Sequence, residues 1–426
     1  HKHRRRQRQM CIRDRYKGAV TMFDFANSLP ADALPATGPW TGFPAYNFVG
    51  GHNDEALIPV DELTDCVLAV MAADGKRLAT YGLGDGPLGY LGLRQFLAGS
   101  LKSRAGMHVD TEEILLLSGS LQALDLVNQT LLRAGDTVVI EESNYGGVYT
   151  RFNRLDVSFV GVPTDSHGMR VDALEQVLSE LKQKGTMPRY IYTIPTVQNP
   201  TGSVMPEDRR RGLLALAKAF DVPVFEDDCY ADLTFDGKRP PALHALDEDG
   251  RVIYCGSFSK TVAPALRVGY LVARQDFLAR AVSYKTDAGS GALEQLVLAE
   301  FCVRQFDSHV KKLSAHLAGK ADLICTAFDK YFGAAADYVR PMGGIFIWVK
   351  LPSAVDTKRL AELAGAQGVA INPGVEWSSA SDASQHMRLC FGYPNALTID
   401  EGIKRLADIC QTEFGLPSHI ANQKEV

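Results

Sequence analysis

The chain has 426 residues, of which 46% are hydrophobic and 22% are charged. This composition is ordinary for a globular protein, and the length favours two domains over a single compact core. No run of about eighteen apolar residues occurs, so no transmembrane helix is expected. The eight cysteines are scattered without a C-x-x-C pair. Their spacing argues against a disulfide framework or a zinc ribbon and predicts a cytoplasmic protein.

The net charge of −5 is distributed unevenly along the chain. Residues 1–17 hold eight Lys or Arg and one Asp, a net charge of +7, so the remainder carries −12. This basic segment has no apolar periodicity and lacks the apolar stretch of a signal peptide. Residues 1–20 are therefore predicted to be a disordered or artefactual tail, and a nucleic-acid-binding arm is the less favoured interpretation. Residues 21–70 are predicted to form an N-terminal arm and the start of a small domain.

Residues 71–300 are predicted to form a large α/β domain, because short apolar runs alternate there with helical patterns. Two of the helices are indicated by apolar residues that recur on one face, at 121–131 and 207–220. Seven apolar runs are interpreted as strands of a mainly parallel sheet that is covered by helices; they span residues 114–117, 137–141, 157–162, 189–194, 222–225, 252–255 and 268–272.

Residues 301–426 differ in character and are predicted to form a smaller α+β domain. Long helical patterns around residues 296–330 lead to the flexible pair Gly343-Gly344 and then to a strand at 345–350. A further helix and two short strands end near Leu389. The sequence thus predicts a small C-terminal domain beside the larger one.

Polar residues follow several of the predicted strands, where strand-to-helix loops of a parallel sheet form ligand sites. Ser118-Gly119-Ser120 comes after the first strand and opens a helix, a suitable seat for a phosphate. Gln198–Gly202 follows the fourth strand, Glu226–Tyr230 follows the fifth, and Gly256–Lys260 follows the sixth, with Arg267 seven residues later. Each motif alone is weak, because glycines and Asn-Pro pairs mark plain turns and acidic residues at strand ends are frequently caps.

Lys260 is harder to explain as an ordinary residue. Most lysines are solvated, whereas this one lies among small hydroxyl side chains at the end of a buried strand. A partly desolvated lysine loses proton affinity and can attack an aldehyde as a neutral amine.

Together, these motifs resemble the fold-type I pyridoxal-phosphate aminotransferases of class I/II. The resemblance is carried by Asn199-Pro200-Thr201-Gly202, Asp227-x-x-Tyr230, Ser257-x-Ser259-Lys260 and Arg267, in that order, and it extends from about Tyr46 to Arg388. It implies a large domain with a mainly parallel seven-stranded sheet between helices, plus a smaller α+β domain. The segments around Asp227, Lys260 and Arg388 are most similar to the 2-aminoadipate/kynurenine-type branch.

The resemblance also implies roles for individual residues around pyridoxal 5′-phosphate. Lys260 would form a Schiff base with the cofactor and shuttle protons, and Asp227 would pair with the pyridine nitrogen. Asn199 and Tyr230 would bind the phenolic oxygen of the ring, and Tyr145 would stack on the ring. The phosphate would be held by Ser120, Leu121, Ser257, Ser259 and Arg267.

The same resemblance extends to the substrates and to the assembly. Arg388 would bind the α-carboxylate of an amino acid or a 2-oxo acid, with 2-oxoglutarate as a common acceptor, and Asn199 would also contact the substrate. Gly51 lies in a Gly50–Asn53 segment that resembles the arm closing over the substrate, although it departs from the commoner Gly-Gly-hydrophobic-Pro and leaves the substrate's identity open. Tyr81 resembles the tyrosine that reaches the phosphate of a neighbouring subunit, which implies a homodimer with shared active sites.

Two alternatives remain open at this point. A C–S lyase or another eliminase would use the same cofactor and the same residues. A transcription regulator could instead carry an aminotransferase-like domain that only senses a ligand. No cluster of His, Cys, Asp or Glu has metal-ligand spacing, so no metal is expected.

Overall fold

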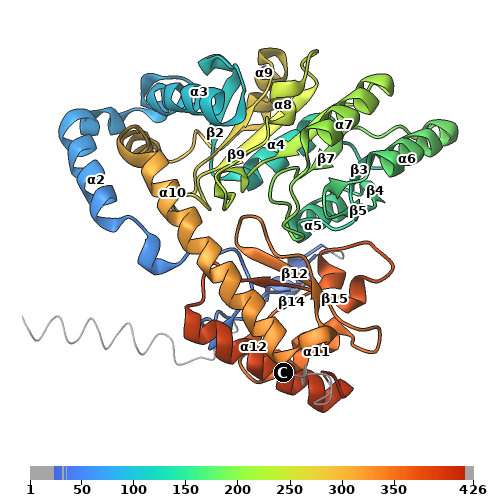
Figure 1. Cartoon of the computed structure of the whole chain (residues 1–426). Helices are drawn as coiled ribbons and strands as arrows, with labels where there is room; N and C mark the ends of the chain where they lie inside the picture. The colour runs from blue at the N-terminus through green and yellow to red at the C-terminus, as the bar shows by residue number, and fades with distance from the viewer. Residues whose placement is uncertain (1–23, 31–32, 35, 418–426) are drawn as a thin grey trace, which may run out of the picture. The chain divides into compact units, whose positions relative to one another are not determined.

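The structure is a computed structural model that describes residues 24–30, 33–34 and 36–417. The predicted tail at residues 1–20 lies outside the described residues. Contacts divide the chain into two units, which end and begin at Phe43 and Pro44. In the first unit, one short 3-10 helix covers Phe25–Ser28 and is capped by the Asp24 side chain. Everything below concerns the second unit (Figure 1).

The second unit contains a seven-stranded sheet in the order β2-β10-β9-β8-β7-β3-β4. Strand β10 is antiparallel to its neighbours β2 and β9, and the other pairs are parallel. The fold is therefore α/β with a mainly parallel sheet, as the sequence predicts. The strands of this sheet are β2 (Ile114–Leu117), β3 (Thr137–Glu141), β4 (Ser158–Val162), β7 (Ile191–Thr193), β8 (Val224–Asp227), β9 (Val252–Ser257) and β10 (Gly269–Val272).

Helices cover both faces of this sheet because its strands bury side chains on both sides. Alternate residues of one strand enter different cores: Leu115 and Leu117 pack with α4 and α5, whereas Ile114 and Leu116 pack with α3 and α10. A third core joins α6 and α7 to the sheet. The helices in this part of the chain are α2 (Val60–Asp74), α3 (Leu91–Ala105), α4 (Ser120–Leu131), α5 (Gly146–Arg154), α6 (Val171–Lys184), α7 (Glu207–Ala219), α8 (Leu243–Leu246) and α9 (Gln275–Tyr284).

A second, four-stranded antiparallel sheet is formed by the C-terminal part of the chain, in the order β11-β12-β15-β14. Its core contains residues of α10, α11 and α12. The long helix α10 contributes to the cores of both sheets and runs from one to the other (Figure 1). The elements of this part are α10 (Ala292–Tyr331), β11 (Asp337–Tyr338), β12 (Phe346–Lys350), α11 (Thr357–Ala366), β14 (Asn372–Pro373), β15 (His386–Cys390) and α12 (Ala396–Phe414).

Two further strand pairs complete the fold: β1 (Tyr46–Asn47) with β13 (Val369–Ala370), and β5 (Thr164–Asp165) with β6 (Gly168–Met169). The first pair joins the segment just before Gly50 to β13, in the C-terminal part of the chain. The predicted domain boundaries at residues 70 and 300 fall inside α2 and α10, so the exact division into domains stays a prediction. No helix among the described residues has the length and apolar character needed to span a membrane.

Candidate active site

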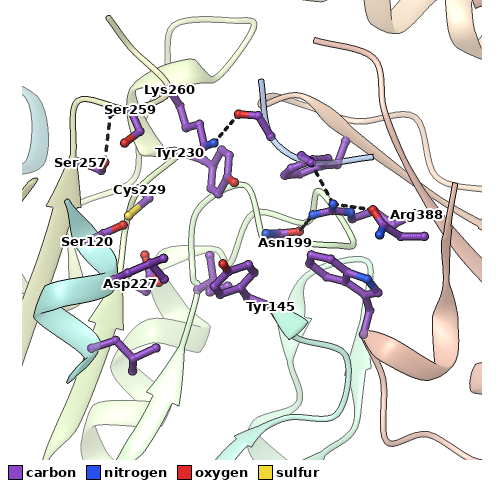
Figure 2. A pocket seen from close by; sticks show the side chains of 18 of the residues that line it. Ser120, Tyr145, Asn199, Asp227, Cys229, Tyr230, Ser257, Ser259, Lys260 and Arg388 are labelled. Atoms are coloured by element: carbon purple, nitrogen blue, oxygen red, sulfur yellow. Dashed lines mark hydrogen bonds between the residues drawn. The ribbon is translucent and has the colours of Figure 1, made fainter. Parts of the chain in front are cut away.

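A cavity of about 370 Å³ lies at the carboxyl ends of β7, β8 and β9, where it also receives side chains from the C-terminal sheet (Figure 2). Its lining includes every site residue proposed from the sequence except Tyr81. Those that line it are Gly51, Ser120, Leu121, Tyr145, Asn199, Asp227, Tyr230, Ser257, Ser259, Lys260, Arg267 and Arg388. Motifs spread over some 340 residues of sequence are thus brought into one cavity, as the clustering of loops at the ends of parallel strands predicts.

Tyr81 is the exception. Its side chain is 87% exposed, and it borders a different hollow with Gly86 and Gln295. Its predicted contact with a neighbouring subunit requires a second copy of the chain and stays a prediction.

Lys260 presents a largely desolvated amine to the cavity. Its Nζ donates a hydrogen bond of 2.5 Å to the carbonyl oxygen of Gly51 (Figure 2). Burial is the main cause that lowers the pKa of this amine, and the nearby guanidinium groups of Arg388 and Arg267 lower it further. A lowered pKa increases the fraction of neutral amine, which is the nucleophilic form.

Asp227 closes the opposite part of the cavity. Burial raises the pKa of its carboxyl, and hydrogen bonds from Cys229 and Tyr192 oppose that rise. The Tyr192 hydroxyl donates to Asp227 Oδ2 at 2.6 Å. Among the described residues Asp227 forms no ion pair, although a buried carboxylate favours a cationic partner. The protonated ring nitrogen of a pyridine would provide one.

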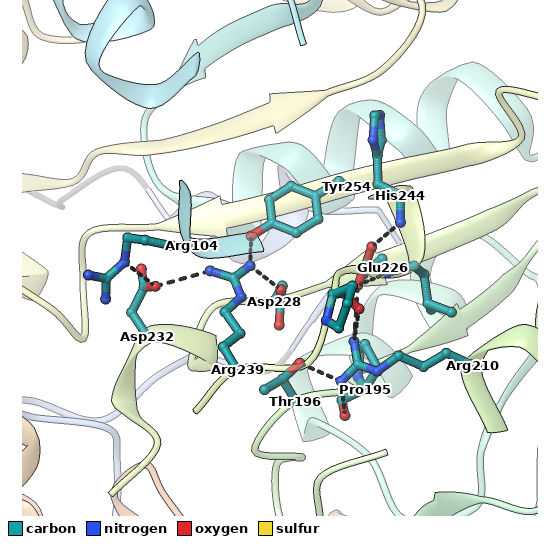
Figure 3. Close-up of polar contacts among 12 residues, drawn as sticks. Arg104, Pro195, Thr196, Arg210, Glu226, Asp228, Asp232, Arg239, His244 and Tyr254 are labelled. Atoms are coloured by element: carbon teal, nitrogen blue, oxygen red, sulfur yellow. Dashed lines mark hydrogen bonds and ion pairs between the residues drawn. The ribbon is translucent and has the colours of Figure 1, made fainter. Parts of the chain in front are cut away.

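Buried polar contacts of Arg239 hold the backbone next to Asp227 in place (Figure 3). Arg239 donates to Asp228 Oδ2 at 2.6 Å, to Asp232 Oδ1 at 3.0 Å and to the Tyr254 hydroxyl at 2.8 Å. The carboxylates of Asp228 and Asp232 thus face away from the cavity lining, and Asp227 alone of the three lines it. This arrangement explains why one acidic residue of the run is available to a ligand.

One corner of the cavity lies at the N-terminus of α4. Ser120 is the first residue of α4, where backbone N–H groups lack intrahelical partners. Arg267 reaches the same corner and donates to the Ser118 carbonyl at 3.3 Å. Gly119 has a φ of 88°, which L side chains rarely adopt, and a Cβ atom there would push the Arg267 guanidinium out of its place, so glycine is favoured here. Hydroxyls from Ser257 and Ser259 complete a donor set suited to a phosphate.

Arg388, on β15, is a buried cation that lacks an anionic partner among the described residues. Its guanidinium lies between two aromatic rings, 3.5 Å from the centroid of Trp377 and 4.0 Å from that of Phe346. It donates to Asn199 Oδ1 at 3.1 Å, to the Gly50 carbonyl at 3.0 Å and to Asn372 Oδ1 at 2.7 Å. Burial lowers its pKa to about 10, which still leaves the group charged at neutral pH.

The hydrogen bonds of Arg388 leave it able to bind an anion. A guanidinium has five N–H donors, and the three hydrogen bonds above use three of them. Its Nε is buried, and no acceptor for it is found in the described part of the chain. A carboxylate that enters the cavity would satisfy this donor and neutralise the buried charge.

Six further residues of the site were missed by the sequence analysis: Tyr192, Leu124, Ile194, Phe346, Asn372 and Trp377. Tyr192 could have been proposed as a neighbour of Asp227. It pairs with Phe225 in the parallel sheet, and Asp227 lies two residues after Phe225 on the same face of β8. Asn372 pairs directly with Arg388, but this register depends on β14 and could not be known beforehand. Trp377 lies in an irregular segment for which no pattern pointed to the cavity.

The comparisons with known proteins agree with this site. The profile of the family described as aminotransferase class I and II matches residues 58–406. The aromatic-amino-acid aminotransferase 1 of Thermococcus litoralis is 34% identical over 86% of this chain and 88% of its own. The 2-aminoadipate transaminase of Thermus thermophilus is 32% identical over 84% of this chain and 88% of its own.

Similarity extends to solved structures and to a second kind of protein. A Pyrococcus horikoshii kynurenine aminotransferase, solved with PMP, superposes with a TM-score of 0.82 at 33% identity, covering 88% of this chain and 92% of that one. The HTH-type transcriptional regulator YdfD of Bacillus subtilis is 32% identical over 79% of this chain and 69% of its own length. The chain therefore belongs to the class I and II aminotransferases. It is a fold-type I, pyridoxal-phosphate-dependent enzyme of that family.

The hydrogen bond between Tyr192 and Asp227 leads to a prediction for cofactor binding. Because the Tyr192 hydroxyl favours the ionised form of Asp227, Tyr192→Phe should raise the pKa of that carboxyl and weaken the affinity for pyridoxal phosphate about tenfold. Equilibrium titration of the apoenzyme with the cofactor measures this change.

Tyr190 provides a matched control for Tyr192. It lies two residues earlier on the same side of the sheet, is also fully buried, and donates a 2.6 Å hydrogen bond to Asn128 instead. Tyr190→Phe should lower stability without changing cofactor affinity. Equal losses of affinity in the two variants would contradict a specific role of Tyr192.

Proposed function

We propose that this enzyme transfers the amino group of an amino acid to a 2-oxo acid at this cavity, through Lys260. The observation that carries the proposal is the convergence of three charged groups without opposite charges among the described residues. Asp227 is a carboxylate without a cation, and Arg267 and Arg388 are cations without carboxylates. A protonated pyridine nitrogen would pair with Asp227, a phosphate with Arg267 and a substrate carboxylate with Arg388.

When bound, the cofactor supplies an aldehyde that reacts with amines and a ring that accepts electrons from the substrate's Cα. The chain's own residues would do the rest. Lys260 Nζ would hold the cofactor as an amine and, as a base, would move the proton of the substrate's Cα. Asp227 would pair with the ring nitrogen and keep it protonated. Arg388 orients the substrate by its carboxylate, while Tyr145, Phe346 and Trp377 exclude water from the reacting atoms.

The identity of the substrates is proposed from relatives to which the chain is similar. The relatives named above act on aromatic amino acids, 2-aminoadipate and kynurenine, according to their descriptions. We propose a donor among these classes and 2-oxoglutarate as the first acceptor to test. The aromatic rings of Tyr145 and Trp377, whose centroids lie 5.8 Å apart, support a donor with an apolar or aromatic side chain.

We also propose a homodimer in which Tyr81 contributes to the partner's site. Large apolar side chains are exposed on α2 and α10, which pack against one another: Val60 is 60%, Leu68 65% and Val303 73% exposed. If these side chains form one surface, they are suited to contact a second copy of the chain. Sedimentation at micromolar concentrations should give twice the chain mass of 46.5 kDa.

A half-reaction tests the proposed function. Holoenzyme is mixed with one amino acid at a time, without an acceptor, and the products are identified by mass. The proposal predicts one equivalent of pyridoxamine phosphate and one of the matching 2-oxo acid per site. Release of pyruvate with ammonia would show a lyase instead. Cofactor binding without any turnover of a broad amino-acid panel would favour the ligand-sensing alternative, which the similarity to YdfD keeps open.

A further inference from the structure

Glu141, the last residue of β3, carries a fully buried carboxylate to which the reaction described above assigns no role. Among the described residues it forms no ion pair, and burial raises its pKa to about 7. Burying an acidic group without a cation is costly unless many hydrogen bonds compensate. Its presence at the edge of the active site therefore requires a reason.

The carboxylate receives hydrogen bonds from four donors in two segments of the chain. At the end of β7, Thr193 Oγ1 donates to Oε1 at 2.5 Å, and the amide of the next residue, Ile194, does so at 3.1 Å. Gln198 Nε2 donates to Oε2 at 3.3 Å. From the loop after β3, Asn144 Nδ2 donates to Oε2 at 2.9 Å. An ionised carboxylate accepts at both oxygens and thus matches all four donors.

Two of these donors lead to two parts of the cavity wall, one at Tyr145 and one at Asn199. Asn144 accepts the backbone N–H of Tyr145 at 2.7 Å, so it links Glu141 to the residue proposed to face the cofactor ring. Gln198 precedes Asn199, which accepts from Arg388. Gln198 also donates to the Ser143 carbonyl at 2.6 Å, which ties the two loops to each other.

We propose that Glu141 is a positioning residue that holds the Tyr145 wall and the Asn199 wall of the active site at a fixed separation. It is not a catalytic residue, because it does not line the cavity and reaches it only through Asn144 and Gln198. This inference rests on the proposed function, since it assigns Tyr145 to the cofactor and Asn199 to the substrate-binding arginine.

Three variants separate the two links. Glu141→Gln places an amide N–H₂ against donor groups and should disturb both walls. Asn144→Ala breaks the link from Glu141 to Tyr145. Gln198→Met breaks the link from Glu141 to the Asn199 loop, and with it the bonds of Gln198 to the Ser143 carbonyl and to Thr201. The measured quantities are the dissociation constant of pyridoxal phosphate from the apoenzyme and the KM for the amino-acid donor.

Asp136 offers a matched control for the loss of a carboxylate on the same strand. It lies just before β3, at the end away from the cavity, and accepts from the Arg133 amide at 2.7 Å and from Arg189 at 2.8 Å. Asp136→Asn removes a hydrogen-bonded carboxylate without touching any residue of the cavity lining. It should lower stability and leave both constants unchanged.

The expected pattern is a split between the two constants. Asn144→Ala should raise the cofactor dissociation constant about tenfold, Gln198→Met should raise KM about tenfold, and Glu141→Gln should raise both. If Glu141→Gln does not fold, the other two variants still test the split. The inference is overturned if wild-type enzyme transfers amino groups but all three variants behave like Asp136→Asn. Absence of transfer in the wild type would instead overturn the proposed function.

Discussion

Lys260→Ala should lower kcat for amino-group transfer by at least about 10⁴-fold, the largest effect expected of any single substitution in this chain. The variant removes both the amine nucleophile and the base that would move the Cα proton. Cofactor binding should persist, because Asp227, Arg267 and the N-terminus of α4 remain. Steady-state kinetics together with the visible spectrum of the purified variant measure both consequences.

Lys260→Arg distinguishes this chemical role from a role of charge alone. Arginine keeps a cation beside the Gly51 carbonyl, but it does not lose its proton near neutral pH and so cannot act as a nucleophile. It should be as inactive as Lys260→Ala. Substantial transfer by either variant would show that another group carries out these steps.

Arg388→Lys should raise KM for the amino acid and lower kcat/KM roughly 10²- to 10³-fold. A lysine cannot bind a carboxylate bidentately, nor can it fill the space between the Phe346 and Trp377 rings with a planar group. The spectrum and the affinity of the bound cofactor should be unchanged, because Arg388 contacts the substrate and not the cofactor in the proposed arrangement. Kinetics with the best donor, compared with a cofactor titration, measure the two effects separately.

Arg405 is the matched control for Arg388. Its guanidinium also lies over an aromatic ring, 5.3 Å from the centroid of Tyr46, but it does not line the active-site cavity. Arg405→Lys should therefore leave kcat/KM within about twofold of wild type. A large loss in this control, or an unchanged KM in Arg388→Lys, would be incompatible with carboxylate binding by Arg388.

Much of the fold was predictable because the strands of a parallel sheet are buried on both faces. Such strands appear in the sequence as short continuous apolar runs, and all seven predicted runs overlap strands of the large sheet. The antiparallel direction of β10 was not predictable, since an apolar run gives no information about strand direction. The long helical region near residue 300 is one helix, α10, where the sequence predicted several.

The part of the site that follows strand ends was predictable for the same reason. Asp227 is the last residue of β8, Lys260 lies three residues after β9 and Asn199 lies six residues after β7. Strands that run parallel in one sheet bring such residues to a common edge. The residues that the C-terminal sheet contributes depend instead on tertiary contacts. Trp377 and Phe346 were missed because only the packing of that sheet against the cavity brings them to Arg388.

The central claim is that Lys260 carries the cofactor, and reductive trapping tests it most directly. Borohydride reduces the C=N bond that an aldehyde forms with a lysine amine to a stable secondary amine, and peptide mass mapping then locates the modified residue. The account predicts one phosphopyridoxyl group per chain, on the peptide that contains Lys260, and none in Lys260→Ala. A modification on another lysine, or an unmodified Lys260 in fully active holoenzyme, would contradict it.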